Sequence, residues 1–460
     1  MDQSCTIHGG HGSGAIYTSF TATGSSYALN YVDTLVGAIN GILANGGNTD
    51  PIGPDSVNSY FPGNQVAGAV PIYQLIPDSV PVSEQTFDIA TAGYVIDTIG
   101  GAVVVNTDSA GGDSILVVGN TMQTTVNAAG SDNLIVFIDG NNVYNGSATS
   151  SGDTVVGGTG NDTINTGAGN TTVNAGDGHD MIYLNDTGAG AYNDSAFLDT
   201  GHDSVIASGT GDYVVATTEG ETVTAGSGEA ATSNLTVLLL PNSDGTASGF
   251  DSITGGAGYL TVTDSSSDNT INGGSGGLSF IGGIGVTATI NTGNGTALIF
   301  GNTGDNITLN TGAGDTGVAA FVAGAGNETL NGAAATSNMI LFGASQADSA
   351  SANDSLVGGA GNDTLVAGAG TEFLTGGAGN NTFLVDFYGS ENANITISDF
   401  LAGNDSVAFG NYSQDQVQAA LSGGQDVNGN FVVTFTDSST SVTFTGVTSA
   451  SQITGHIITF

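Results

Sequence analysis

The chain has 460 residues and carries 42 Asp and Glu side chains with no Lys or Arg, which gives a formal net charge of −42. This balance excludes nucleic acid as a partner, because no cationic side chain can receive phosphates, and it excludes Lys-dependent covalent catalysis. No apolar run reaches the length of a membrane span, so we expect no membrane insertion, and the acids must find their counter-charge in an external cation.

Residues 1–95 form a segment that differs from the rest of the chain. The stretch "SSYALNYVDTLVGAINGILANGG" repeats apolar residues about every 3.6 positions and ends at Gly46 and Gly47, which predicts one helix. Six of the seven prolines lie between Pro51 and Pro81, so the part after the helix is predicted to be irregular chain or a linker. The apolar positions of the helix are Leu29, Val32, Leu35, Val36, Ile39 and Ile42.

The single cysteine, Cys5, lies close to two histidines. Cys5, His8 and His11 could together bind a borderline metal ion, and the alternative is a flexible terminus with an incidental free thiol. His179 and His202 precede loop acids and are predicted to face solvent.

Residues 96–390 show a nine-residue period. The segments "GGTGNDTIN" (157–165) and "GGAGNDTLV" (358–366) each begin a run of three such nonapeptides. Each nonapeptide supplies a loop and a short strand with one inward apolar residue, and two of them make one 18-residue coil. The fold class is therefore predicted to be all-β, a right-handed parallel solenoid. The inward positions are Ile164, Val173, Ile182, Leu365, Leu374 and Phe383.

An 18-residue coil stacks Asp162 over Asp180 on one edge, one strand spacing of about 4.8 Å apart. Thr171 lies on the opposite edge. Two stacked carboxylates repel each other unless a cation lies between them. Calcium takes six to eight oxygen ligands from carboxylates and backbone carbonyls, so the sequence predicts a calcium site here.

The motif G-G-x-G-x-D-x-U-x, where U is a large apolar residue, occurs at 157–165 and 358–366. It resembles the repeat of the RTX (repeats-in-toxin) family of calcium-binding β-rolls. The resemblance implies that each calcium ion is shared by loop side chains one coil apart. Those pairs are Asp162 with Asp180, Asp354 with Glu372, and more weakly Asp363 with Asn381. The loop glycines that would supply carbonyl ligands are Gly158, Gly160, Gly176, Gly178, Gly359, Gly361, Gly368 and Gly370.

Other parts of the repeat region depart from this motif. Asp153 faces Thr171 and would be half a site at most. Most of residues 205–345 lacks the loop Asp, so we expect a metal-free solenoid with Asn and Thr ladders there. The stretch "YNDSAFLDTGHDSV" (192–205) breaks the register and is predicted to be a protruding loop.

Residues 391–460 are predicted to form a C-terminal β region. The stretch "ITISDFLAGNDSVAFGNYS" (395–413) resembles the segment that follows RTX repeats in proteins exported by type I secretion. Residues 432–449 resemble the β-hairpin usually found behind that segment, and "HIITF" resembles the apolar end that such C-terminal signals often carry. The start of the chain lacks the features of a Sec signal peptide. The resemblance implies an extracellular or bacterial cell-surface location.

Two strings resemble catalytic motifs. "GGDSILVV" (111–118) is similar to the serine segment of one esterase class, but no partner His and Asp follow, which favours a strand after a turn. "FLDTG" (197–201) resembles an aspartic-protease loop, and that chemistry needs two such loops facing each other from separate lobes. We therefore expect no enzyme.

The leading functional interpretation is a secreted calcium-binding structural protein that assembles head to tail with copies of itself into a filament, surface layer or matrix. Residues 1–95 would act as an assembly connector. A surface adhesin that binds glycans is the second interpretation, and a polysaccharide-acting enzyme is the third. An anionic polysaccharide would meet the charge of −42 without any Lys or Arg to receive it.

Overall fold

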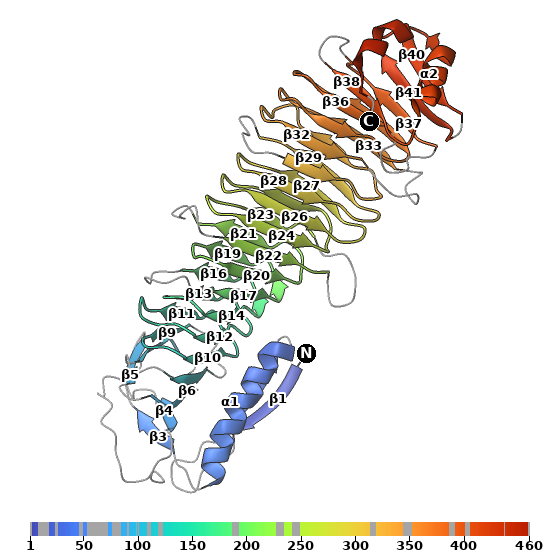
Figure 1. Ribbon diagram of the computed structural model, residues 1–460. Helices are drawn as coiled ribbons and strands as arrows, with labels where there is room; N and C mark the ends of the chain where they lie inside the picture. Colours follow the sequence, from blue (N-terminus) through green and yellow to red (C-terminus); the bar gives the residue numbers. More distant parts are fainter. Residues whose placement is uncertain are drawn as a thin grey trace. The chain divides into compact units, whose positions relative to one another are not determined.

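The computed structural model divides the chain into two compact units, each nearly all β (Figure 1). The N-terminal unit comprises Met1–Glu229 with Ser233–Thr236, and the C-terminal unit comprises Ala230–Thr232 with Val237–Phe460. Each unit is a parallel β-solenoid, as the sequence predicted. The structure describes residues 2–7, 18–23, 26–45, 49–52, 72–75, 84–89, 92–97, 99, 101–107, 112–117, 123–185, 193–226, 234–241, 249–312, 319–343, 352–385, 392–400, 405–436 and 438–458.

Two parallel sheets form the N-terminal unit. N-sheet 1 contains β3 (Thr49–Ile52), β4 (Ile72–Leu75), β6 (Tyr94–Asp97), β8 (Ser114–Val117), β10 (Leu134–Phe137), β12 (Thr154–Val156), β14 (Thr172–Asn174), β17 (Ser195–Leu198) and β20 (Asp212–Ala216). N-sheet 2 contains β5 (Gln85–Ile89), β7 (Val103–Thr107), β9 (Thr124–Ala128), β11 (Val143–Gly146), β13 (Thr163–Asn165), β16 (Met181–Leu184), β19 (Ser204–Ala207) and β21 (Thr222–Ala225). A short third pairing joins β15 (Asp177–Gly178) to β18 (Thr200–Gly201).

Two parallel sheets also form the C-terminal unit. C-sheet 1 contains β24 (Leu260–Asp264), β26 (Leu278–Gly282), β28 (Ala297–Phe300), β30 (Ala319–Val322), β32 (Met339–Phe342), β34 (Thr364–Val366), β36 (Thr382–Val385), β38 (Ser406–Phe409) and β42 (Ile457–Ile458). C-sheet 2 contains β23 (Ser252–Thr254), β25 (Asn269–Asn272), β27 (Thr287–Asn291), β29 (Asn306–Asn310), β31 (Thr329–Asn331), β33 (Asn353–Val357), β35 (Thr371–Thr375) and β37 (Asn394–Ile397). The strand β22 (Leu235–Leu239) lies at the boundary between the units.

The core of each unit lies between its two sheets. All six predicted inward residues are fully buried, with 0% of their surface exposed. Successive residues of a strand point to opposite faces, so each strand contributes its alternate side chains to this core. Burying one aliphatic or Phe side chain stabilises the fold by about 1.5–3 kcal/mol, and the stacked coils repeat that contribution along the chain.

The 18-residue coil holds where the motif is intact. Thr163 pairs with Met181 between β13 and β16, which is a shift of 18 residues. The next coil is longer, because Met181 pairs with Ser204 between β16 and β19. The prediction that residues 192–205 form a protruding loop is therefore wrong. That stretch contains β17, β18 and the start of β19, and the extra residues of the longer coil precede it.

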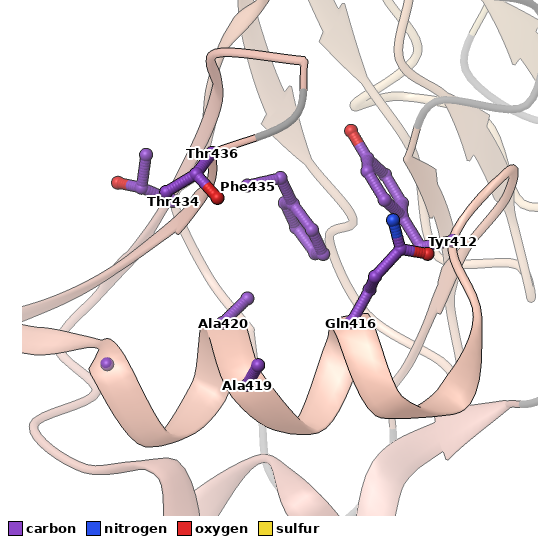
Figure 2. Close-up of a pocket in the computed structure, with 8 residues that line it drawn as sticks. Tyr412, Gln416, Ala419, Ala420, Thr434, Phe435 and Thr436 are labelled. Carbon is purple, nitrogen blue, oxygen red and sulfur yellow. The ribbon is translucent and has the colours of Figure 1, made fainter.

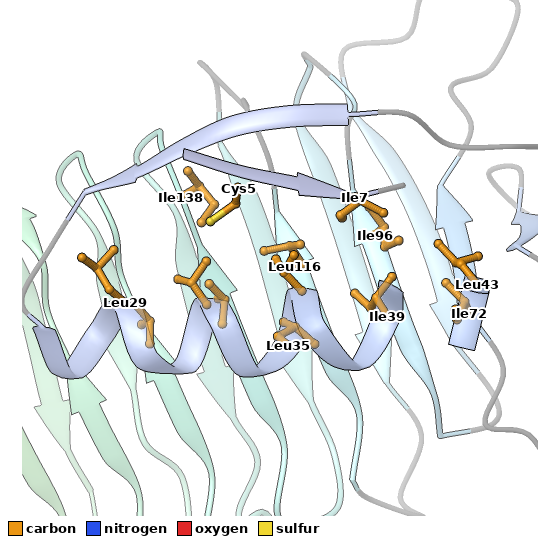
Figure 3. Packing of buried hydrophobic residues seen from close by; sticks show 14 residues of the cluster. Cys5, Ile7, Leu29, Leu35, Ile39, Leu43, Ile72, Ile96, Leu116 and Ile138 are labelled. Carbon is orange, nitrogen blue, oxygen red and sulfur yellow. The ribbon is translucent and has the colours of Figure 1, made fainter. Parts of the chain in front are cut away.

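The helix α1 (Ser26–Ala44) confirms the amphipathic pattern, with Leu29, Val32, Leu35, Val36 and Ile39 buried and Ile42 partly buried. A hairpin of β1 (Asp2–Ile7) and β2 (Thr18–Thr23) accompanies it. Together they cover the outer face of N-sheet 1, where they meet Ile72, Ile96, Leu116, Val136, Ile138 and Val156 (Figure 3). The apolar side of the helix is thus used within its own chain.

Most of the predicted irregular linker lies outside the described residues, but two short parts of it, 51–52 and 72–75, belong to strands. Strand β3 contains Pro51 and pairs in parallel with β4, so N-sheet 1 begins well before residue 96. Proline lacks the N–H that an inner strand needs, and edge strands tolerate it. Among the described residues, the register pairs the strand that contains Pro51 with β4 alone.

The C-terminal part contains the predicted hairpin, with β40 (Asn430–Phe435) antiparallel to β41 (Thr440–Thr445). The short β39 (Gln425–Val427) pairs with β40, and β42 extends C-sheet 1 in parallel with β38. A helix that the sequence analysis missed, α2 (Gln414–Gly423), begins at Ser413, which forms a capping box with Gln416. Two short 3₁₀ turns follow at Ala450–Gln452 and Thr454–His456. Within the described part of the chain, neither α-helix has the length and hydropathy that crossing a bilayer requires.

Candidate metal centre

Four acids stack at the edge where the strands of N-sheet 2 begin. We call Asp162, Asp180, Asp203 and Glu221 the first acid column. Each precedes the first residue of its strand, namely Thr163, Met181, Ser204 and Thr222. Because the strands are in parallel register, the column repeats once in every coil. The pairing of Asp162 with Asp180 is the one that the 18-residue period predicted.

Each carboxylate of the column accepts a hydrogen bond from the backbone of the preceding coil. The N–H of Asp162 donates to Asp180 Oδ1 at 2.7 Å, and the N–H of Asp180 donates to Asp203 Oδ1 at 2.8 Å. The same contact joins Asn142 to Asp162 Oδ1 at 2.6 Å and Asp203 to Glu221 Oε2 at 2.6 Å. These bonds fix the direction of each side chain, so the column is ordered by the solenoid itself.

The second oxygen of three of these carboxylates is unpaired. Among the described residues, Oδ2 of Asp162, Asp180 and Asp203 is buried and has no hydrogen-bond partner. The side chains are only 1–2% exposed, and the chain contains no Lys or Arg to neutralise them. A buried carboxylate without a partner is costly, so these oxygens require either a proton or a cation from outside the chain.

The electrostatics of the column agree with this requirement. Burial, followed by repulsion from neighbouring acids, raises the pKa of Asp162 and of Asp180 to about 8. Burial raises the pKa of Asp203 to about 6. Desolvation and like charge both disfavour the ionised form of a carboxyl group. A divalent cation would reverse both effects, because it replaces the lost solvation and separates the negative charges.

The predicted glycines lie where backbone carbonyls of adjacent coils approach them. Gly158 has φ +87°, and a Cβ there would lie 2.4 Å from the carbonyl oxygen of Phe137. Gly176 has φ +97°, and its Cβ would lie 2.1 Å from the carbonyl oxygen of Gly158. Only glycine allows this close stacking of loops. Gly160 and Gly178 repeat the arrangement in the same loops, since a Cβ on Gly178 would meet the Gly160 carbonyl.

The donor atoms fit calcium. The column offers carboxylate oxygens, and the glycine loops offer carbonyl oxygens, which are the ligands of a hard cation. Within the described ranges, no three His, Cys, Asp or Glu side chains converge on one point. A calcium ion between Asp162 and Asp180 would therefore need carbonyl oxygens or water to complete its coordination.

A second acid column lies in the C-terminal unit. Asp354 of β33 and Glu372 of β35 are register partners, as the sequence predicted. Glu328 extends this column, because its N–H donates to Asp354 Oδ1 at 3.0 Å. All three are 0% exposed. Burial and the neighbouring Asp354 raise the pKa of Glu328 and of Glu372 to about 9. The loop before β35 contains Gly368 and Gly370, and Gly370 has φ +97°.

Asp363 and Asn381 also come together, but their polar atoms are better satisfied. The N–H of Asp363 donates to Asn381 Oδ1 at 2.9 Å. Asp363 itself accepts backbone hydrogen bonds on both oxygens, from Met339 at 2.8 Å and from Gly359 at 2.7 Å. This pair is the weakest of the three candidates, since it presents no unpaired carboxylate oxygen. A Cβ on Gly359 or on Gly361 would again lie within 2.4 Å of a carbonyl oxygen.

Asp153 has both oxygens occupied by its own chain. Its Oδ1 accepts from the N–H of Asn133 at 2.8 Å, and its Oδ2 accepts from the Tyr144 hydroxyl at 2.5 Å. Opposite it, Thr171 donates its N–H to Asp194 Oδ1 at 2.7 Å. Asp153 thus has a structural role in the opposite edge of the coil.

The sequence analysis missed four acids, namely Asp194, Asp203, Glu221 and Glu328. A signal for Asp203 was present, because "GHD" occurs at 178–180 and again at 201–203. Because the two copies lie 23 residues apart, a search for periods of 9 and 18 residues does not find Asp203. The imidazole rings of His179 and His202 stack at 5.5 Å between centroids, and both side chains are exposed.

The structure describes the other candidate sites only in part. Cys5 is buried in the contact between β1 and N-sheet 1, and His8 and His11 lie outside the described residues. "GGDSILVV" supplies strand β8, as predicted. A pocket of about 380 Å³ lies between α2 and β40 (Figure 2). Its lining contains no carboxylate, His or Cys, and the rings of Tyr412 and Phe435 stack there at 3.9 Å.

Comparison with known protein families agrees with this geometry. Residues 147–182 and 348–383 match the model of the RTX calcium-binding nonapeptide repeat, which describes four copies of the repeat. The first match contains Asp162 and Asp180, and the second contains Asp354, Asp363 and Glu372. No curated protein and no solved structure matches the chain.

Proposed function

This chain is an RTX β-roll protein, and from that premise we propose that it is a secreted structural protein whose fold is completed by calcium and which assembles with copies of itself. The RTX repeats imply calcium binding. The single observation that carries the proposal is the first acid column. The Oδ2 atoms of Asp162, Asp180 and Asp203 are buried and have no hydrogen-bond partner among the described residues, and the chain contains no Lys or Arg.

Calcium would act on this column in a simple way. When bound, the ion supplies the positive charge that the carboxylates lack. The residues of the chain do the rest: Asn142, Asp162 and Asp180 donate the backbone hydrogen bonds that orient the carboxylates, and the glycines leave room for stacked loops. Extracellular calcium is in the millimolar range in which extracellular calcium-binding modules are occupied. Because calcium binding stabilises the folded state, folding would be completed once the chain is outside the cell.

Secretion is supported by the C-terminal part. RTX repeat proteins are typically exported by type I secretion, and residues 395–413 resemble the segment that follows their repeats. Within the structure, β37, β38 and the hairpin β40–β41 close the C-terminal unit. We place the protein outside the cell or on a bacterial cell surface, and we assign it no enzymatic role.

Self-assembly is supported by the architecture. Stacked coils leave strand edges at their ends, and unpaired edges are templates for pairing with another chain. Lys blunts such edges in many proteins, but this chain has none. Head-to-tail contact between unlike ends would give an open fibre. Residues 1–95 stay the predicted connector, and within them the apolar side of α1 packs on N-sheet 1.

Light scattering of the full chain, with millimolar calcium and with a chelator, tests the proposed function. We expect large, calcium-dependent particles, since the cation screens −42 charges per chain. As a matched control, magnesium at the same ionic strength should give much smaller scattering, because it prefers a tight octahedral site with retained waters. A monodisperse monomer at high protein concentration in calcium would contradict self-assembly and would favour the glycan-binding adhesin instead.

A further inference from the structure

The outer faces of N-sheet 1 and C-sheet 1 carry similar apolar rows. In N-sheet 1 the row is Ile96, Leu116, Val136 and Val156, which are register partners on β6, β8, β10 and β12. In C-sheet 1 the row is Ile281, Phe300, Val322 and Phe342, which are register partners on β26, β28, β30 and β32. Both rows therefore run across four adjacent strands.

The two rows differ in what covers them. The row of N-sheet 1 is at most 3% exposed, because α1 and the β1–β2 hairpin pack on it (Figure 3). On C-sheet 1, Ile281 is 46% exposed and Phe300 is 39% exposed. Beside this row, Leu298 is 36% exposed and Ile340 is 40% exposed. We call Ile281, Leu298, Phe300 and Ile340 the bare face.

Charge decides what could cover the bare face. Its four strands, "LSFIG", "ALIF", "AAFV" and "MILF", contain no acid. Elsewhere two copies of a chain with 42 acids and no Lys or Arg would repel each other. An acid-free sheet face is where two copies can approach without that cost, and a flat patch matched with itself needs only a two-fold axis. Adjacent exposed apolar side chains of this kind mark interaction sites.

We propose that the bare face is the docking surface for a second copy of this chain, placed face to face. The inference rests on the proposed self-assembly and names a second, lateral contact within it. Burial of Phe300, Ile340 and their neighbours against the same residues of the partner removes apolar surface from water. The N-terminal unit shows that this chain stabilises such a row by covering it with aliphatic side chains. Face-to-face pairing of this kind would thicken an assembly that also forms through contacts at the strand ends.

Sedimentation of the full chain in calcium tests this surface. The test variant is Phe300→Thr with Ile340→Thr, and Thr is chosen because a β-branched residue keeps the strand preference. The matched control is Phe373→Thr on β35 of C-sheet 2, where Phe373 is 51% exposed. We expect the test variant to weaken association by about 10- to 100-fold, from the area that the two side chains lose. The control should associate like the wild type.

Cross-linking tests the proximity of two copies at the bare face by a measurement that does not depend on destabilising the sheet. The native Cys5 is buried, so Ile340→Cys adds one accessible thiol near the proposed axis. Under oxidising conditions in calcium it should give a disulfide-linked dimer, whereas Phe373→Cys should give little.

The outcomes separate the two proposals. If the wild type assembles and the Thr variant assembles equally well, or if Ile340→Cys does not cross-link, the bare face is not the contact while the proposed function stands. If the wild type stays monomeric in calcium, self-assembly fails and this inference fails with it.

Discussion

The first acid column and the coils around Asp264 and Asp305 both bury acids at the edges of the solenoid but satisfy them differently. In the first acid column, Asp162 and Asp180 each hold one backbone hydrogen bond and keep a second buried oxygen that has no partner within the described chain. In the C-terminal unit, Asp264 accepts hydrogen bonds from Asn269 on both oxygens, at 3.0 Å each. Asp305 accepts from the backbone of Val286 at 2.9 Å and of Asn302 at 2.6 Å.

From this difference we expect that the solenoid does not need the same ion at every coil. Around Asp264, the strands are tied by an Asn ladder, in which Asn291 donates to Asn272 at 2.7 Å and Asn310 donates to Asn291 at 3.2 Å. Such a ladder is neutral and complete. The first acid column is ionisable and incomplete, so its stability depends on pH and on cations in solution. The coils near Asp180 should respond to calcium, and those near Asp264 should not.

Calcium removal should give the largest effect. Each occupied site stabilises the folded state by about 2.7 kcal/mol when free calcium is a hundred times its Kd. We expect chelation to lower the unfolding midpoint substantially, and hydrogen exchange to rise in β13, β16 and β19 much more than in β25, β27 and β29. The measurement is thermal unfolding with residue-resolved exchange. Equal exchange in both regions would remove the distinction between them.

Mutation of the calcium site shared by Asp162 and Asp180 should give the second-largest effect on stability. Asp162→Ala and Asp180→Ala should each lose up to about 2.7 kcal/mol of stability in calcium, and the double variant should lose little more, because both remove the same ion. Denaturant unfolding in calcium and in chelator measures this. Asp264→Ala is the control, and its cost should be the same in both conditions. Fully additive losses from the pair would show that Asp162 and Asp180 serve different ions.

Acid should partly replace calcium. The folded-state pKa of about 8 for Asp162 and Asp180 lies above the value near 4 of an unfolded Asp. Between these values the folded state binds more protons, so without calcium the stability is highest below about pH 4 and is lost as the pH rises through about 8. Unfolding in chelator across this range should show the decline. With calcium present the decline should be much weaker, and an identical profile in both would contradict the account.

The smallest effect should come from the Asn ladder. Asn291→Ala removes two side-chain hydrogen bonds, which contribute about 1 kcal/mol each. The loss should not change between calcium and chelator, because no carboxylate is involved. Denaturant unfolding of this variant in both conditions provides the check, and a calcium-dependent loss would mean that the two kinds of ladder are coupled.

Much of this arrangement was visible in the sequence. The G-x-G-x-D motifs show which residues occupy equivalent positions in successive 18-residue coils. The pairs Asp162 with Asp180 and Asp354 with Glu372 could therefore be predicted. The amphipathic spacing predicted α1, and the resemblance of residues 432–449 to the hairpin that follows RTX repeats predicted β40 and β41. These features depend on local patterns, which a single sequence carries in full.

The rest depends on contacts that no local pattern contains. The 23-residue coil moved Asp203 out of the expected phase, although "GHD" repeats at 178–180 and 201–203. Strand β3 forms despite Pro51, because the register pairs it with β4 alone in the described structure. The position of α1 on N-sheet 1 follows from tertiary packing of its apolar side. The bare face becomes recognisable only when the covered row of N-sheet 1 is set beside it.

The most direct test of the central claim is the number of calcium ions that the full chain binds, measured by calorimetric titration of the wild type, Asp180→Asn and Asp264→Asn. The Asn variants keep the size of the side chain and remove its charge. The account predicts that Asp180→Asn loses at least one equivalent of calcium, while Asp264→Asn binds as much as the wild type. Unchanged stoichiometry and affinity in Asp180→Asn would contradict it.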